Sequence, residues 1–118
     1  MRKLVKEECL EAVALGGFGP AITGAASSVA VVLTQSWCPQ WRWMRSYLER
    51  LAAREGPELA IFWVEYDRED FFEPFMAFKE EVLGNDQVPF VLYYRGGALA
   101  RSSNFIDEGG FLRALALA

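Results

Sequence analysis

The chain has 118 residues, of which 53% are hydrophobic, so it is long enough for one domain with its own core and too short for two. Its formal net charge of -4 argues against nucleic acid as a main partner, because phosphate binding requires clustered lysine and arginine. The absence of histidine and the presence of only two cysteines argue against a Cys/His metal site and against a secreted disulfide framework.

The N-terminal part of the sequence predicts a helix and then a loop. Apolar residues in the segment 2–15 recur at helical spacing, and Gly16 follows as a stop signal. We expect residues 16–28 to form a loop, with a short extended piece around residues 21–23. No strand is expected ahead of the helix.

The long uncharged segment 12–41 does not predict a membrane-spanning helix. Glycine, proline and serine interrupt it, so it contains no apolar helix of the ~20 residues that a bilayer requires. Acidic residues near the N-terminus also break any signal-peptide core; they are Glu7, Glu8 and Glu11. We therefore expect a soluble, cytoplasmic protein with no membrane partner.

A strand, a helix and a second strand follow in the centre of the chain. Residues 29–33 and 59–64 are apolar throughout, which is typical of strands that are covered on both faces. Between them, residues 42–55 have the pattern of an amphipathic helix. This order predicts a right-handed parallel crossover.

The remaining elements are a helix, a hairpin and a last helix. Residues 67–83 predict a helix rich in phenylalanine, with Asp70 as its N-cap. Residues 90–94 and 99–103 predict a hairpin, and the last helix opens at residues 106–107. The whole predicts an α/β fold in which a mixed sheet of four to five strands carries helices on both faces.

Cys38 is the candidate nucleophile, and it lies between the strand at 29–33 and the helix at 42–55. At such a junction the backbone N–H groups are unsatisfied and the helix dipole is positive, so the thiolate is favoured over the thiol. Pro39 suits the first turn of a helix, where a missing N–H costs nothing. The alternative is an inert cysteine that packs as a small hydrophobic residue. We expect an accessible, reactive thiol.

The segment Trp37-Cys38-Pro39-Gln40-Trp41 resembles the Trp-Cys-x-x-Cys signature of the thioredoxin superfamily. The resemblance covers residues 29–118 and includes Val88-Pro89, which resembles the cis-proline segment of that family. It implies a single thioredoxin-like domain over residues 1–118, with residues 1–28 as an N-terminal helix and loop. The substrate-binding residues that it implies are Trp37, Pro39, Trp41, Val88 and Pro89.

The resemblance also implies that Pro89 follows a cis bond and lies against the reactive sulfur, leaving the backbone of Val88 free to bind a peptide. The alternative is an ordinary trans proline at the start of a strand. Arg42, one turn beyond Cys38, either adds positive potential that stabilises the thiolate or is a solvated surface charge. Helical spacing turns Trp41 toward the core, whereas Trp37 is the better candidate for an exposed rim that grips a partner.

The sequence departs from the family where the resolving cysteine should stand, because Trp41 occupies that position. A mixed disulfide on Cys38 has no neighbouring thiol to release it, and Cys9 offers only a weak alternative. Val32 stands where many thioredoxins carry a buried aspartate, so a proton relay is also missing. Gln35 replaces the lysine with which glutaredoxins hold glutathione.

Two functions remain open. The first is a monothiol thiol–disulfide oxidoreductase, in which Cys38 forms mixed disulfides with a protein or a low-molecular-weight thiol and an external thiol resolves them. The second is a redox-inactive module that binds a peptide in the groove beside Pro89. We expect neither a cofactor nor a metal, and enzymatic activity stays an open question.

Overall fold

The computed structural model describes residues 1–116; residues 117–118, the end of the predicted core, lie outside the described part. Its centre is a five-stranded mixed sheet in the order β1-β3-β2-β4-β5. The strands are β1 (Arg2–Lys3), β2 (Ser28–Thr34), β3 (Leu59–Glu65), β4 (Phe90–Arg95) and β5 (Ala98–Ser103). β2 pairs in parallel with β3 and antiparallel with β4, so the predicted mixed sheet is confirmed.

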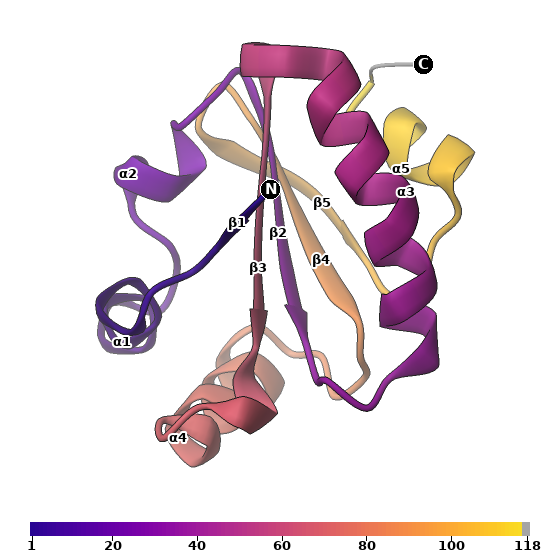
Figure 1. Cartoon of the computed structure of the whole chain (residues 1–118). Coiled ribbons are helices and arrows are strands. Elements are labelled where there is room, and N and C mark those ends of the chain that lie inside the picture. Colours follow the sequence, from indigo (N-terminus) through magenta and orange to yellow (C-terminus); the bar gives the residue numbers. More distant parts are fainter. Residues whose placement is uncertain (117–118) are drawn as a thin grey trace.

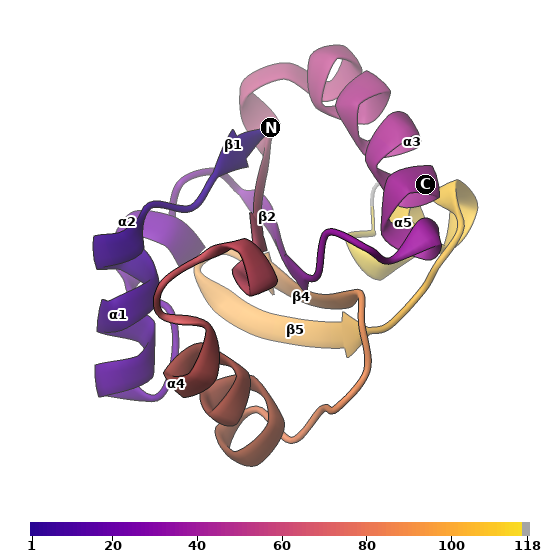
Figure 2. The ribbon, with the colours of Figure 1, turned by 60° about the horizontal axis from the view of Figure 1, so that its bottom comes forward.

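Helices cover both faces of this sheet, as Figures 1 and 2 show. One face carries α1 (Lys6–Leu15), α2 (Pro20–Thr23) and α4 (Phe72–Ala77), and the other carries α3 (Pro39–Glu55) and α5 (Glu108–Ala114). Short turns named η1 (Gly56–Glu58), η2 (Tyr66–Arg68) and η3 (Phe78–Val82) connect them, the last in a π-helical conformation. The predicted α/β fold with two covered faces is thus confirmed.

The alternation of side chains along β2 divides the core in two. Val29, Val31 and Leu33 belong to the hydrophobic cluster beneath α1 and α4, whereas Ala30 and Val32 belong to the cluster beneath α3 and α5. Every residue of β2 is buried. An unbroken apolar run is therefore what this strand requires, since successive side chains point into different halves of the core.

Three local expectations are wrong. The predicted helix over residues 2–15 begins only at Lys6, because the first residues pair with β3 as the short strand β1. The predicted extended piece around residues 21–23 is the helix α2, with Gly19 as N-cap and proline at its first position. Asp70 does not cap a helix; its carboxylate accepts a hydrogen bond from Lys6 Nζ at 2.8 Å.

The two edges of the sheet differ in kind. β1 has only two residues and leaves most of β3 without a partner on that side. β5 is exposed along nearly its whole length, and its pairing with β4 shifts register between Tyr93 and Tyr94. Within residues 1–116, no helix combines the length and apolar character needed to cross a membrane.

Candidate functional site

Cys38 is the N-cap of α3, so its sulfur lies at the end of the helix where backbone N–H groups are free. Its carbonyl accepts the N–H of Arg42 at 3.3 Å, and its own N–H donates to the Gln35 carbonyl at 3.2 Å. The helix begins three residues earlier than predicted, at Pro39, whose fixed φ suits the first helical position.

The side chain of Cys38 is only 3% exposed, so the expectation of an accessible thiol is wrong for this conformation. Its Sγ lies 3.8 Å from the carbonyl oxygen of Val88, fifty residues further along the chain. Val88 also packs against the hydrophobic cluster to which Cys38 belongs. The segment ahead of β4 therefore covers the sulfur.

That covering segment contains a cis peptide bond between Val88 and Pro89. The chain there is held from the end of β5, because Asn104 Nδ2 donates to the Pro89 carbonyl at 3.0 Å. The structure thus brings Cys38, Val88 and Pro89 together at one end of the sheet. The Cys38 thiol contacts the Val88 carbonyl, a backbone group that the resemblance implied would be free to bind a peptide.

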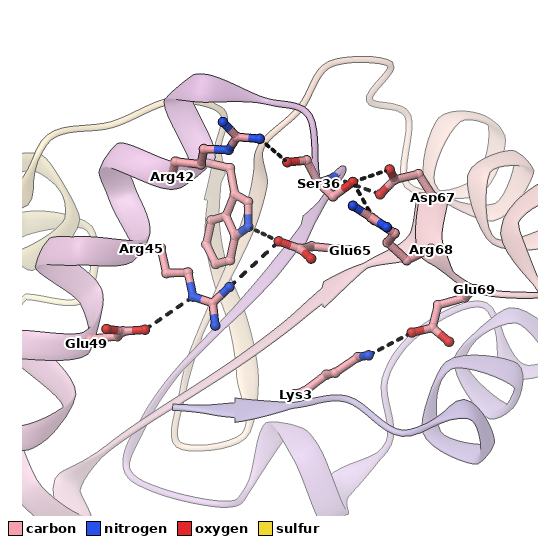
Figure 3. A network of polar contacts seen from close by, with 10 residues as sticks. Lys3, Ser36, Arg42, Arg45, Glu49, Glu65, Asp67, Arg68 and Glu69 are labelled. Atoms are coloured by element: carbon pink, nitrogen blue, oxygen red, sulfur yellow. Dashed lines mark hydrogen bonds and ion pairs between the residues drawn. The ribbon is translucent and has the colours of Figure 1, made fainter.

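Trp41 is completely buried, so its side chain offers no surface to a ligand, contrary to its place among the candidate binding residues. Its Nε1 donates a 2.8 Å hydrogen bond to Glu65 Oε2 at the end of β3, and its ring packs against Trp63 with centroids 5.9 Å apart. Arg45 forms an ion pair with the same carboxylate at 3.8 Å (Figure 3). The position at which the Trp-Cys-x-x-Cys signature would have its second cysteine is thus filled by a packed, hydrogen-bonded indole.

The loop that precedes Cys38 is anchored by Asp67, which was not among the predicted site residues. Asp67 accepts two short hydrogen bonds from Ser36, one from its backbone N at 2.7 Å and one from its Oγ at 2.6 Å (Figure 3). Arg68 Nε donates to the same Oγ at 3.0 Å. An acidic residue two positions after the end of β3, at the end of the sheet where the cysteine loop lies, was the available signal.

Arg42 makes its polar contact with this loop. Its Nη2 donates to the Ser36 carbonyl at 3.5 Å, and the side chain is exposed (Figure 3). The guanidinium thus reaches the backbone two residues ahead of Cys38. Its effect on the thiolate stays a prediction.

Aromatic side chains are exposed on either side of the start of α3. Trp37 is 60% exposed and its Nε1 donates to Gln35 Oε1 at 2.5 Å. Trp43 is 51% exposed and packs against Phe105, with ring centroids 5.4 Å apart. Trp37 thus exposes apolar surface at the residue directly before Cys38, and Trp43 does so on α3.

Cys9 lies on the other side of the sheet. It is completely buried between α1 and the sheet, and burial raises the pKa of its thiol to about 12. Cys9 and Cys38 belong to the two separate halves of the core, whereas a disulfide needs Cα atoms within about 7 Å. Cys9 is therefore not placed to resolve a disulfide on Cys38.

The described residues contain no group of three or more Cys, His, Asp or Glu side chains that could hold a metal ion. The candidate site therefore consists of one buried thiol, a helix N-terminus, a cis-proline segment and an exposed tryptophan.

Comparisons with known proteins identify solved structures that resemble this one. No protein-family model matches the sequence, and no curated protein matches it either. The structure is similar to reduced desulfothioredoxin from Desulfovibrio vulgaris Hildenborough, with a TM-score of 0.63 and 24% identity over 97% of this chain and 93% of that chain.

The structure is also similar to two plant proteins. Thioredoxin O1 from Arabidopsis thaliana, in its oxidised state, has a TM-score of 0.65 and 19% identity, covering 97% of this chain and 96% of that chain. Thioredoxin F from spinach chloroplast has a TM-score of 0.62 and 18% identity, covering 82% of this chain and 75% of that chain. Together with the sheet order, these likenesses show that the chain has the fold of the thioredoxin superfamily.

Proposed function

We propose that the protein is a monothiol thiol–disulfide exchange protein in which Cys38 is the nucleophile. The observation that carries the proposal is the position of Cys38 at the N-cap of α3, with its Sγ 3.8 Å from the Val88 carbonyl beside Pro89. The thiolate is the form that attacks disulfides, and a helix N-terminus presents free backbone N–H groups that can bind an anion. The thioredoxin fold of the chain supports thiol–disulfide chemistry in general.

The exchange has two steps. The Cys38 thiolate attacks one sulfur of a partner disulfide, forms a mixed disulfide, and releases the other sulfur as a thiolate that takes a proton from water. An external thiolate then attacks the partner sulfur of the mixed disulfide, forms a new disulfide with it and returns Cys38 as a thiolate. The net reaction exchanges one disulfide for another, so no further oxidant or reductant is needed.

Trp41 restricts the protein to this external resolution. Its indole is completely buried and bonded to Glu65 at 2.8 Å, so the first turn of α3 carries no second sulfur. The partner class is a protein or peptide disulfide, or a low-molecular-weight one. Since Cys38 is 3% exposed, attack requires displacement of the Val88–Pro89 segment from the sulfur.

The proposal is tested by incubating the folded protein with oxidised glutathione and locating the adduct by mass spectrometry of its peptides. We expect one glutathione on Cys38, none on Cys9, and release by dithiothreitol. The Cys38→Ser variant is the control and should take up none. A folded wild-type protein that forms no adduct on Cys38 contradicts the proposal.

A second candidate function is supported by a different observation. Cys38 is nearly inaccessible while Trp37 is 60% exposed, which fits a redox-inactive module that binds a peptide beside Pro89. The two functions differ in their dependence on sulfur. Peptide binding that is unchanged in Cys38→Ser supports the binding module, and binding that disappears with the sulfur supports the exchange protein.

A further inference from the structure

Lys79 is a buried lysine that the proposed chemistry does not use. It lies in the π-helical turn η3, and its side chain is 0% exposed. Burial lowers the pKa of its ammonium group, while the carboxylates of Glu80 and Asp86 raise it. A buried charge persists only where specific partners compensate for lost hydration, so the partners of Lys79 indicate its role.

The polar partner of Lys79 is the backbone of Asn85. Lys79 Nζ donates to the Asn85 carbonyl at 2.8 Å, and the Asn85 N–H donates to the Lys79 carbonyl at 3.2 Å. The ammonium also lies over the ring of Phe90, 5.6 Å from its centroid, at the start of β4. Lys79 thus holds both sides of Asn85 and touches the strand into which the cis-proline segment leads.

Hydrogen bonds of Asn85 connect Lys79 to the cis-proline segment. Its side-chain amide exchanges two hydrogen bonds with that of Asn104, at 3.0 and 2.9 Å, and its Oδ1 accepts the Gln87 N–H at 3.0 Å. Asn104 Nδ2 also donates to the Pro89 carbonyl at 3.0 Å. The chain from Asn85 to Pro89 is therefore fixed at both ends by side chains from η3 and from the end of β5.

We propose that Lys79 is a positioning residue that, through Asn85 and Asn104, holds the Val88 carbonyl over Cys38 and so controls access to the thiol. The Val88 carbonyl lies 3.8 Å from Cys38 Sγ, within the segment that this network restrains. A weaker network allows the segment to move away and the sulfur to meet solvent. This inference rests on the proposed function only in taking Cys38 to be the reacting group.

The test measures the rate at which iodoacetamide alkylates each cysteine in the folded protein, with mass spectrometry of the peptides. Cys9 is completely buried on the other face, so its alkylation reports global unfolding in the same sample. We expect Lys79→Met to raise the rate at Cys38 by about tenfold, which corresponds to ~1.4 kcal/mol of local opening. The rate at Cys9 should stay unchanged.

Two further variants sharpen the result. Lys6→Met removes an exposed lysine that pairs with Asp70 at 2.8 Å, and it should leave both rates unchanged. Asn104→Ala breaks the same network from the residue after β5 and should also raise the alkylation rate at Cys38. It keeps the test available if Lys79→Met does not fold.

Equal rises at Cys9 and Cys38 in the network variants, or no rise at Cys38, overturn the positioning role. Failure of wild-type Cys38 to form a mixed disulfide, together with a selective rise in alkylation, overturns the exchange function and leaves the positioning role intact.

Discussion

Replacing Trp41 with cysteine tests what this residue contributes to stability and how it limits the chemistry of Cys38. The variant restores a Cys-x-x-Cys spacing at the start of α3, but it removes a completely buried indole. It also removes the donor that Glu65 bonds at 2.8 Å and the ring that packs against Trp63. We therefore expect a protein that is less stable and yet chemically more capable.

The size of the stability loss follows from the packing. Truncating a buried tryptophan costs about 3–5 kcal/mol, and cysteine refills only a small part of the volume. In the variant, the Glu65 carboxylate still has polar surroundings that offset the lost hydrogen bond, because its side chain is 21% exposed and Arg45 lies 3.8 Å away. A loss of about 4 kcal/mol lowers the Tm of a chain of this length by roughly 15 °C, since the entropy of unfolding is about 2.1 cal/mol/K per residue.

Two measurements check this prediction. Urea denaturation gives the free energy of unfolding, and reduction of insulin by dithiothreitol gives the catalytic effect. Trp41→Ala is the matched control, because it leaves a similar cavity without adding a thiol. The wild type and Trp41→Ala should remain near background in insulin reduction, while Trp41→Cys exceeds both. A stability loss below about 1 kcal/mol, or equal activity of the cysteine and alanine variants, would refute the reasoning.

Three other predictions concern the core, the cysteine loop and the exposed rim. Burial raises the pKa of Cys9 and of Tyr93 to about 12, whereas the unfolded groups ionise near pH 9.0 and pH 10.0. As the pH rises, these groups lose their protons in the unfolded state before they do so in the folded state, so the free energy of unfolding should fall above pH ~9. Urea denaturation at several pH values should show a fall of up to about 1.4 kcal/mol per pH unit for each group. The fall should be shallower in Cys9→Ala. Asp67→Ala removes both acceptors of Ser36 and should cost about 1–3 kcal/mol in urea denaturation, against a smaller loss in Asp67→Asn. Trp37→Ala should change the free energy of unfolding by less than about 0.5 kcal/mol, because the ring is 60% exposed. It should slow the reaction of Cys38 with a peptide disulfide more than the reaction with oxidised glutathione. Equal slowing of both reactions argues against a peptide-binding rim.

Much of the fold could be predicted because its signals are local. The apolar run of β2 and the proline directly after Cys38 mark a buried strand and a helix start with no knowledge of the rest of the chain. α2 was not predicted, because four residues are too few for helical periodicity to appear. The local signals for it were Gly19 as N-cap and Pro20 at the first helical position.

The features that were missed depend on residues distant in sequence. The sulfur of Cys38 contacts the carbonyl of Val88, fifty positions away, and no local sequence pattern reports that contact. The bond from Trp41 to Glu65 likewise joins a helix to the end of a strand, so helical spacing indicated a buried indole but not its polar partner. Local propensity decides which elements form, whereas the order of the strands decides which of their ends meet.

The edges of the sheet bear on how the protein behaves at high concentration. An open edge is a template for intermolecular strand pairing and aggregation, and the β5 edge here carries features that limit that risk. On one side, β1 pairs with only two residues of β3. On the other side, the register between β4 and β5 skips Ala100, so the outer strand carries a bulge. Arg101 adds the single charge within β5, two positions after Leu99, which is 58% exposed. Without that charge, the bulge would be left as the feature of β5 that opposes pairing with another strand.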